Sequence, residues 1–256
     1  MLIRSFLIIS LFVFSSCSFL KKDNLSNEEK FELGISYFSK KKFQKAKDTF
    51  EFLVQNEAGN LGVESNFHLA MVLFELEEYD QASYHFNYYS TFSKNIDNIQ
   101  LSQFMKCKCA FEMCTSYTKD QTNSLFAISI IQEFLDTFPY SSYKEDAYEM
   151  INDLRNRLSK KYYEAGRLYM KMKKFDSAFY YFNIVMTEYY DTDYFDEALI
   201  SYIFTYIVMK NYDEAEKYFL SNKEKFQSID KQNEAQKILT DYKDRLGLSG
   251  LYRLYK

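Results

Sequence analysis

One spacing of five residues occurs four times along this 256-residue chain. In every copy the third residue is aromatic, the fourth is alanine and the fifth is phenylalanine. The copies are Gly34, Tyr37, Phe43, Ala46 and Phe50; Ala70, Leu73, Tyr79, Ala82 and Phe86; Gly166, Tyr169, Phe175, Ala178 and Phe182; and Ile203, Tyr206, Tyr212, Ala215 and Phe219. Small residues let two helices approach closely, and the aromatic rings fill the space around them. The spacing therefore predicts one helix pair per copy and a stack of such pairs.

The repeated spacing fits the tetratricopeptide (TPR) unit, which consists of two antiparallel helices. The whole chain holds only six glycines and one proline, so it has few helix breakers. We therefore predict an all-α fold, a TPR-type α-solenoid of about five helix pairs.

The third unit is irregular. Its second helix carries Ala127, Ile131 and Pro139 at the expected offsets, but an insertion around Ser116–Thr122 separates it from its first helix. We assign units 1 to 3 to residues 26–140.

The spacing between the third and fourth units exceeds one period, which predicts one long helix over about residues 142–172. Ser142 could cap this helix, because Glu145 follows three residues later as in a capping box. A tight turn is expected near Lys173–Lys174.

We assign the long helix, units 4 and 5 and a C-terminal capping helix to residues 141–247. The capping helix is expected from about Ser228 to Arg245, with Gly247 as its stop. Residues 248–256 form a tail without an assignment.

The N-terminus predicts a lipoprotein signal peptide over residues 1–16. Arg4 gives a short basic start, the run Phe6–Phe14 is apolar, and Ser15 and Ser16 precede Cys17. The apolar run is far shorter than the roughly 20 residues needed to span a bilayer. Cys17 would then carry a covalent lipid and residues 17–25 would form a tether. An ordinary secretory signal with a chance cysteine is the alternative.

Three further cysteines, Cys107, Cys109 and Cys114, lie in a segment predicted to be helical. On a helix, Cys107 and Cys114 would be roughly 10 Å apart along the axis, which is beyond the reach of a disulfide. A metal site would require a non-helical segment and a fourth ligand. We expect these cysteines to be small buried hydrophobic residues.

The composition argues against several function classes. The net charge of −4 gives no basic footprint for nucleic acid. The two histidines, His68 and His85, both fall inside repeat patterns, and no HExxH, GxSxG or glycine-rich phosphate loop is present. We therefore expect no catalytic residue, no metal and no cofactor other than the lipid on Cys17.

A cysteine after a signal peptide, five TPR units and a long helix after FPYSSY resemble the BamD family of outer-membrane β-barrel assembly lipoproteins. FPYSSYKEDAYEMINDLRNRLSKKYYEAG resembles that family's run into its long helix. YYDTDYFDEAL resembles its link into the last repeat, with Tyr190 where proline is usual. CKCAFEMCTSYTKDQTNSLFAISIIQEFL looks like the third unit of Bacteroidetes versions. The resemblance covers about residues 17–225.

This resemblance implies a non-enzymatic scaffold that a lipid holds at the periplasmic face of the outer membrane. The implied partners are a BamA-like outer-membrane protein and unfolded outer-membrane proteins. BamA docking would fall on the C-terminal repeats and the long helix, for which Arg155, Tyr163 and Arg167 are the candidates.

Two other functions share the same repeat pattern. One is a TPR adaptor lipoprotein of another envelope complex, in division, secretion or motility, which would differ only in its partner. The other is a nutrient-binding TPR lipoprotein. The absence of tryptophan and the lack of an acidic run after Cys17 count against the nutrient-binding protein.

The first helices of units 1 and 2 are apolar on a second face, the one that lines the concave side of a TPR stack. The positions are Phe31, Ile35, Phe38, Phe67, Met71 and Phe74. A surface helix needs only one apolar stripe, and an exposed apolar strip marks a partner site. We therefore predict a substrate groove for varied apolar segments here. Burial of these residues by superhelical curvature or by the N-terminal segment is the alternative.

Overall fold

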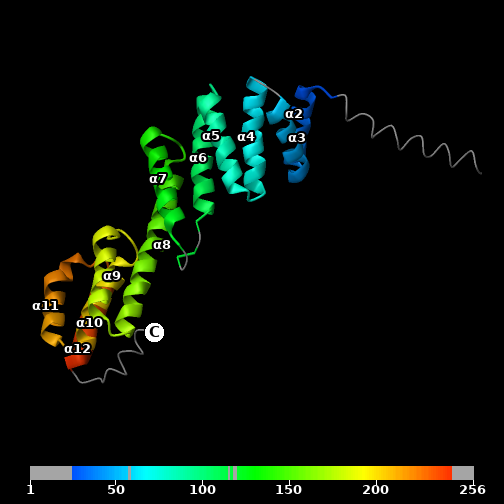
Figure 1. Cartoon of the computed structure of the whole chain (residues 1–256). Coiled ribbons are helices and arrows are strands. Elements are labelled where there is room, and N and C mark those ends of the chain that lie inside the picture. The colour runs from blue at the N-terminus through cyan, green and yellow to red at the C-terminus, as the bar shows by residue number, and fades with distance from the viewer. Residues whose placement is uncertain (1–24, 57–58, 115, 118–119, 244–256) are drawn as a thin grey trace, which may run out of the picture. The chain divides into compact units, whose positions relative to one another are not determined.

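The structure is a computed structural model that describes residues 25–56, 59–114, 116–117 and 120–243. Within these residues all regular secondary structure is helical (Figure 1). Two compact units can be distinguished: residues 1–113 with 132–143, and residues 114–131 with 144–256. The predicted all-α TPR solenoid is confirmed. Cys17, Gly247 and the tail over residues 248–256 lie outside the described residues.

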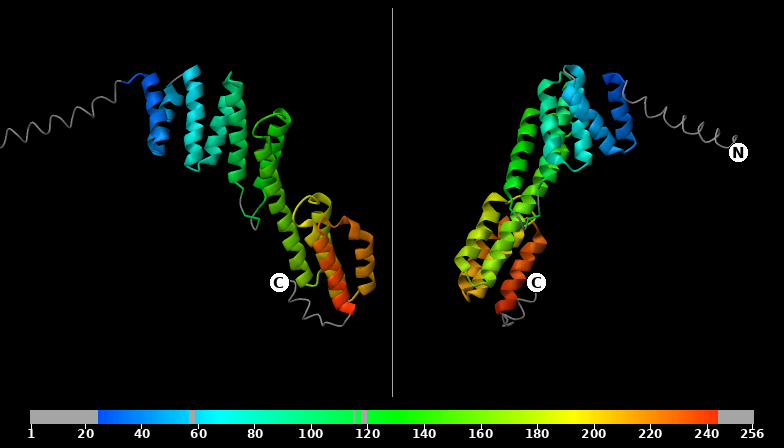
Figure 2. Two further views of the ribbon diagram at one scale, coloured as in Figure 1. Left: turned by 180° about the vertical axis from the view of Figure 1, so that it is seen from behind. Right: turned by 45° about the vertical axis from the view of Figure 1, so that its right-hand side comes forward.

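The first unit is a row of antiparallel helices. It contains α2 (Asn27–Ser39), α3 (Phe43–Asn56), α4 (Asn60–Glu75), α5 (Tyr79–Phe92) and α6 (Ile96–Glu112). Each helix packs against the next one along the chain, as the two further views show (Figure 2). At its start, Ser26 Oγ accepts from Glu29 N and Glu29 Oε2 accepts from Ser26 N, a complete capping box.

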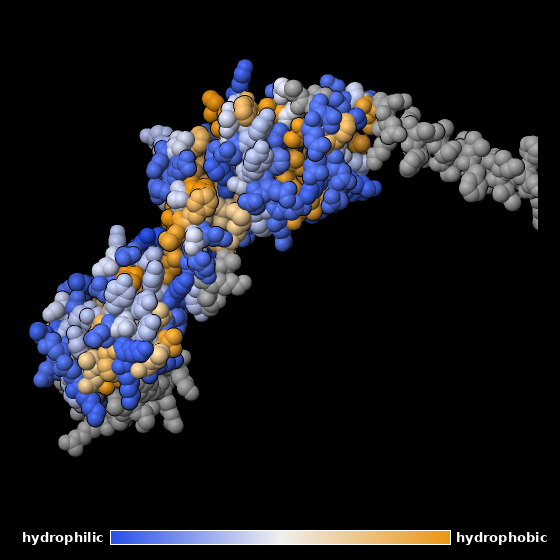
Figure 3. All heavy atoms as spheres, viewed as in Figure 1, coloured by the Kyte–Doolittle hydropathy of each residue, from blue (hydrophilic) through white to orange (hydrophobic). Residues whose placement is uncertain are grey.

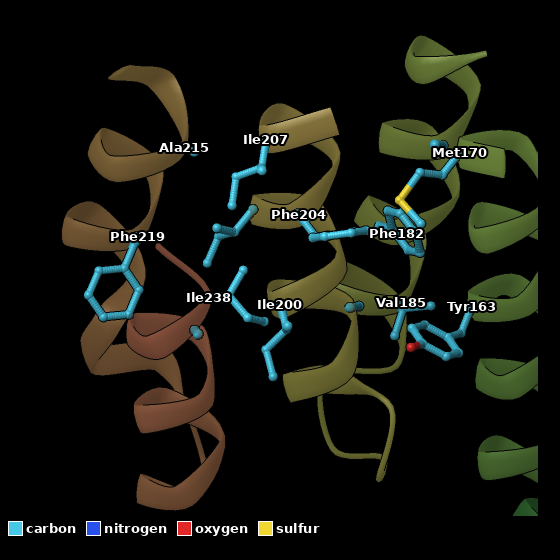
Figure 4. Packing of buried hydrophobic residues seen from close by; sticks show 14 residues of the cluster. Tyr163, Met170, Phe182, Val185, Ile200, Phe204, Ile207, Ala215, Phe219 and Ile238 are labelled. Atoms are coloured by element: carbon cyan, nitrogen blue, oxygen red, sulfur yellow. The ribbon is translucent and has the colours of Figure 1, made fainter. Parts of the chain in front are cut away.

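The second unit is built around the long helix. It contains α8 (Lys144–Lys171), α9 (Phe175–Glu188), α10 (Phe195–Val208), α11 (Tyr212–Asn222), the short 3₁₀ turn η1 (Lys223–Lys225) and α12 (Ile229–Lys243). Its core extends from α8 through α9 and α10 to α11 and α12, and Phe182 and Phe204 within it are fully buried (Figure 4). Helix α12 covers α10 and α11, which agrees with its predicted capping role.

The boundary between the units passes through α7 (Thr122–Thr137). In the first unit, Phe134 packs against Phe104 with their ring centroids 5.8 Å apart. In the second unit, Lys160 Nζ lies 4.4 Å from the ring of Tyr117 in the inserted loop. The boundary between the compact units therefore lies within the predicted third repeat. The predicted ranges 26–140 and 141–247 placed that whole repeat in the first range.

Four turns between paired helices share one geometry. Lys41, Glu77, Lys173 and Lys210 all have φ between 55° and 61°. Around Lys173, its N–H donates to the Met170 carbonyl and the next N–H, of Lys174, donates to the Tyr169 carbonyl. The other three turns have the same two bonds. This is a Schellman motif, which ends the first helix of each regular unit and confirms the turn predicted at Lys173–Lys174.

Two local predictions were wrong. The long helix spans Lys144–Lys171, close to the predicted range of about 142–172, but its first residue follows Tyr143, so Ser142 does not stand at the N-cap position. The hydroxyl of Ser141 accepts from Tyr143 N at 3.3 Å. Helix α6 ends at Glu112, so Cys114 lies beyond it. Cys107 and Cys109 are within α6 and buried, and Cys114 is half-buried.

Candidate functional site

The predicted repeat-packing residues differ in burial. The five alanines of this set, Ala46, Ala82, Ala127, Ala178 and Ala215, are fully buried. Phe50, Phe86 and Phe182 are fully buried and Phe219 nearly so, whereas Tyr37 and Tyr169 are half-buried. Pro139 is exposed two residues after the end of α7. These residues build the scaffold on which the candidate surfaces lie.

The predicted groove residues form one set in the first unit, which we call the groove row: Phe31, Ile35, Phe38, Phe67, Met71 and Phe74. Three lie on α2 and three on α4. All six are half-buried and pack against the core of this unit. The row is therefore neither a fully exposed strip nor fully enclosed. Hydrophobic surface shows between hydrophilic residues over this part of the molecule (Figure 3).

His68 joins the two helices of the groove row. Its ring stacks on Phe50 at 5.4 Å, and the rings of Phe31 and Phe67 meet it edge-on at 5.2 Å and 5.4 Å. Burial lowers the pKa of His68, so the ring is neutral at physiological pH. His68 thus packs between the aromatic side chains of the groove row.

The row ends near the turns that follow α2 and α4. Phe38 packs against Phe43 with ring centroids 5.7 Å apart, and Phe74 packs against Tyr79 at 5.3 Å. Lys108 Nζ lies 5.5 Å from the ring of Phe74. A cation next to a half-exposed ring gives this end of the row a positive as well as an apolar character.

A pocket of about 480 Å³ lies beside α2 and α3, and sequence reasoning missed it. Leu33, Tyr37 and Phe52 form its apolar wall, and Lys30 Nζ lies 4.2 Å from the ring of Phe52. The only sequence signal was that Phe52 is an aromatic residue outside the repeat-packing set, on the exposed side of α3.

Among the docking candidates, Arg155 has the most ordered surroundings. Its Nε and Nη2 donate to the two carboxylate oxygens of Asp191 at 3.1 Å and 2.6 Å, and Nη2 also donates to the Glu188 carbonyl at 2.8 Å. The guanidinium lies 5.4 Å from the ring of Tyr189. Its hydrogen bonds and charge hold the pKa of the Asp191 carboxyl below its usual range. Arg155 therefore fastens α8 to the segment between α9 and α10.

The other two docking candidates differ in exposure. Tyr163 is only 6% exposed, packs against Phe182 and Tyr194, and accepts from Ser201 Oγ at 3.4 Å. Burial raises its pKa. Arg167 is half-buried and donates from Nη1 to Glu164 at 3.2 Å. Tyr163 therefore has a packing position, while the docking role of all three remains a prediction.

The link between α9 and α10 is held by polar contacts. Thr192 Oγ1 bonds to Ser159 Oγ at 2.8 Å, and Asp193 N donates to Asn156 Oδ1 at 3.0 Å. The buried carboxylate of Asp196 accepts from the backbone N–H groups of Gln227 and Ser228 at 3.0 Å and 2.8 Å. Asp196 thus anchors the start of α12, a role with no local sequence signal because its partners are 31 and 32 residues away.

No group of three or more His, Cys, Asp or Glu that could hold a metal ion occurs in the described part of the chain. His85 pairs with Asn66 at 2.8 Å, far from the buried thiols in the sequence. Helices long and apolar enough to cross a membrane are also absent from the described residues.

Comparisons with known proteins point to one family. The profile of the YfiO family, described as outer membrane lipoprotein, matches residues 23–221. The outer membrane protein assembly factor BamD of Rickettsia prowazekii is 26% identical over 187 residues, which are 72% of this chain and 74% of that protein. The protein of the same name from Caulobacter vibrioides is 25% identical over 118 residues, which are 46% of this chain and 39% of that protein.

Similar solved structures include a thermophilic TPR protein from Thermus thermophilus, with a TM-score of 0.36 and 12% identity over 84% of this chain and 100% of that one. MamA aligns with a TM-score of 0.34 and 16% identity over 78% of this chain and 91% of that one. The helix pairs described above and the match over residues 23–221 show that the chain belongs to the YfiO family of outer membrane lipoproteins.

Proposed function

We propose that this protein is a non-enzymatic scaffold of the outer-membrane β-barrel assembly machinery. It binds a BamA-like protein and unfolded outer-membrane proteins, and a lipid on Cys17 holds it at the periplasmic face of the outer membrane. Two relatives named outer membrane protein assembly factor support the assembly role. The observation that carries substrate binding is the groove row, six half-exposed apolar side chains on two adjacent helices.

The chemistry of the groove row suits varied apolar segments. Phenylalanine rings give flat contact area, and Met71 adapts to different shapes because its side chain is flexible and polarisable. Each residue also packs on the core, so little side-chain freedom is lost when a ligand binds. Lys108 beside Phe74 would favour a segment with a carboxylate near an aromatic end.

The second unit supports partner docking in a different way. Arg155 is fixed by Asp191, the Glu188 carbonyl and Tyr189, so this part of its surface is rigid before any partner arrives. Preorganised arginine and tyrosine side chains are typical of the residues that dominate binding energy at interfaces. The C-terminal repeats and α8 are therefore the proposed BamA-binding region.

The groove is tested with Phe38→Asp combined with Phe74→Asp. Crosslinking to a peptide from the aromatic end of a barrel protein should fall at least tenfold, because two carboxylates would face the apolar segment. Tyr84→Asp combined with Phe92→Asp, at side chains of α5 that are 66% and 57% exposed, is the matched control and should crosslink like the unaltered chain.

Both groove residues are half-buried, so the double variant could lose stability as well. A photocrosslinking amino acid at Met71 in the otherwise unaltered chain gives the second measurement. Efficient crosslinks from Met71 to the barrel peptide are expected. Equal peptide crosslinking by a folded double variant, or none from Met71, would refute the groove.

A further inference from the structure

Four tyrosines form a continuous stack on one side of α8 and α9, which we call the tyrosine ladder: Tyr189, Tyr162, Tyr181 and Tyr169. The successive ring centroids are 5.6, 6.3 and 5.3 Å apart, and the rings are inclined by 29°, 27° and 6°. Arg155 continues the stack beyond Tyr189. Such a row of flat rings is a preorganised surface, because each ring holds the next in place.

The ladder is partly open. Tyr162, Tyr169 and Tyr181 are half-buried, and Tyr180, which meets Tyr181 edge-on at 5.4 Å, is 63% exposed. Within the second unit, α9 packs extensively against α8, and α10 makes a smaller contact with it. Both contribute to the core that contains Tyr163, and Tyr162 and Tyr169 pack against this core. The ladder thus packs against the core with one part of its rings and leaves large aromatic side chains half-exposed on the surface of this repeat.

In the next repeat, a helix of this chain covers the tyrosines at the equivalent positions. In the repeat spacing, Tyr206 on α10 and Tyr218 on α11 are the equivalents of Tyr169 and Tyr181. The preceding helix α9 covers them. The Phe179 ring lies 4.7 Å from Tyr206, and the Tyr218 hydroxyl donates to Met186 Sδ at 3.5 Å. One helix covers this tyrosine face with a phenylalanine and a methionine seven residues apart.

In the second repeat, a preceding helix also covers the equivalent positions, which hold other residues. There, Asn66 and Leu73 on α4 stand at the positions of Tyr162 and Tyr169. They are 4% and 1% exposed, because α3 packs against α4. The equivalent face is covered by a preceding helix in repeats 2 and 5. In repeat 4 it carries half-exposed tyrosines instead.

We propose that the tyrosine ladder docks an amphipathic α-helix of a partner protein, which presents apolar side chains of the Phe and Met kind seven residues apart. The partner helix takes the place that α9 takes on repeat 5. Tyrosine and arginine are enriched among the residues that carry binding energy. The inference deepens the proposed function, on which it rests for the existence of a partner that docks on α8.

The first test uses the helix that the chain itself provides. The probe is a synthetic peptide of residues 175–188, with a hydrocarbon staple joining the exposed positions 183 and 187 so that it is helical. Calorimetry with the full chain from residue 18 should show saturable binding. A Phe179→Asp peptide should bind at least tenfold more weakly. No saturable binding, or equal binding by both peptides, would overturn the proposal.

Protein variants locate the binding. Tyr181→Asp should weaken peptide binding at least tenfold, whereas Tyr84→Asp, at an exposed tyrosine of α5, should leave it unchanged. Should Tyr181→Asp unfold, Tyr169→Trp replaces it. The chain has no tryptophan, so this single reporter should shift its emission to shorter wavelength when the peptide binds. An unshifted emission at saturating peptide contradicts the assignment to the ladder.

A second test addresses the partner in its native setting. A photocrosslinking amino acid at Tyr180, at the edge of the ladder, should join to a helical segment of another protein in envelope membranes. Crosslinks to a second copy, to other parts of this chain or to extended substrate segments would overturn the proposal. BamA co-purification with the unaltered chain is measured in parallel. Absence of BamA co-purification would contradict the proposed function. The peptide-binding result tests helix binding by the tyrosine ladder independently of it.

Discussion

The ring of Phe182 occupies the space into which a side chain at Gly166 would point. A Cβ atom added at Gly166 would lie 2.5 Å from Cε1 of Phe182, closer than real Cβ atoms come to a neighbour. Gly34 and Phe50 have the same relationship at 2.7 Å. In both repeats the glycine allows the phenylalanine of the second helix to reach the backbone of the first.

Gly166→Ala should therefore destabilise the protein by about 1–3 kcal/mol through overpacking. The sign of the change in stability is diagnostic, because replacing a helical glycine by alanine otherwise stabilises a helix by up to about 1 kcal/mol. Urea unfolding followed by circular dichroism measures the change. Asn183→Ala, at an exposed position of α9, is the control and should change stability by less than about 0.5 kcal/mol. A stabilised Gly166→Ala variant would show that the close contact does not exist.

Arg155→Gln should lower stability at neutral pH by about 0.2–1 kcal/mol, since the Asp191 side chain is 44% exposed and solvent screens the pair. The pKa of Asp191 is lowered in the folded protein by the hydrogen bonds and charge of Arg155. A carboxyl whose pKa is lower in the folded than in the unfolded protein adds stability at pH values above its unfolded pKa of about 4. This added stability is lost as the pH falls through the folded pKa.

The stability difference between Arg155→Gln and the unaltered chain should thus be constant from pH 7 to about pH 5 and shrink as the pH falls further. Urea midpoints across this pH range measure it. Lys217→Gln is the control, because the Lys217 side chain is 73% exposed and its pairing with Glu214 should contribute nothing measurable. A difference that grows on acidification would contradict the role given to this pair.

The thiols should differ in reactivity. Burial raises the pKa of Cys107 and Cys109 to about 12, so almost no thiolate forms at pH 8. Cys114 is half-buried after the end of α6. Iodoacetamide at pH 8 should therefore label Cys114 first, and Cys107 and Cys109 only after denaturation. Mass spectrometry of the alkylated peptides measures this order, and fast labelling of Cys107 in the native protein would refute it.

The lipid anchor is predicted from the sequence alone, because Cys17 lies outside the described residues. Cys17→Ala should leave the protein without lipid and loosely bound to membranes, since several acyl chains are needed for stable anchoring. Radiolabelled palmitate and membrane fractionation measure both effects. Equal palmitate incorporation by the variant would show that Cys17 is not the acceptor.

The sequence predicted the helix pairs because their packing depends on local spacing. Ala178 and Phe182 occupy adjacent turns of one helix, so a fixed pattern reveals their shared face. It could not predict the cap that Asp196 forms on the start of α12, because its partners come from a distant part of the chain. The ladder was missed for a similar reason. Tyr162 and Tyr181 come from two helices, and the abundance of tyrosine, 24 residues in all, hid their alignment.

The groove row shows that the spacing of apolar residues does not predict how exposed a second apolar face is. Spacing placed Phe31 and Phe67 outside the repeat-packing positions, but a second apolar face can be exposed or can pack on its neighbours. The His68 ring contacts both phenylalanines, which also pack against the core and are half-buried. A single histidine in a repeat gives no sign of this role until its neighbours are placed.

Removing the C-terminal repeats after Glu188 would be a coarse test of docking. Helix α10 contributes Ile200, Ile203 and Phe204 to the same core as Phe182, so truncation would expose this core as well as remove a docking surface. Intact chains with single substitutions avoid this ambiguity.

The most direct test of the account is affinity purification of the intact protein from envelope membranes, with BamA detected by mass spectrometry. The account predicts that BamA co-elutes with the unaltered chain in amounts comparable to the bait. It also predicts that Tyr84→Asp, outside the proposed docking region, leaves this co-elution unchanged. Recovery of the intact protein with another envelope complex and without BamA would contradict it.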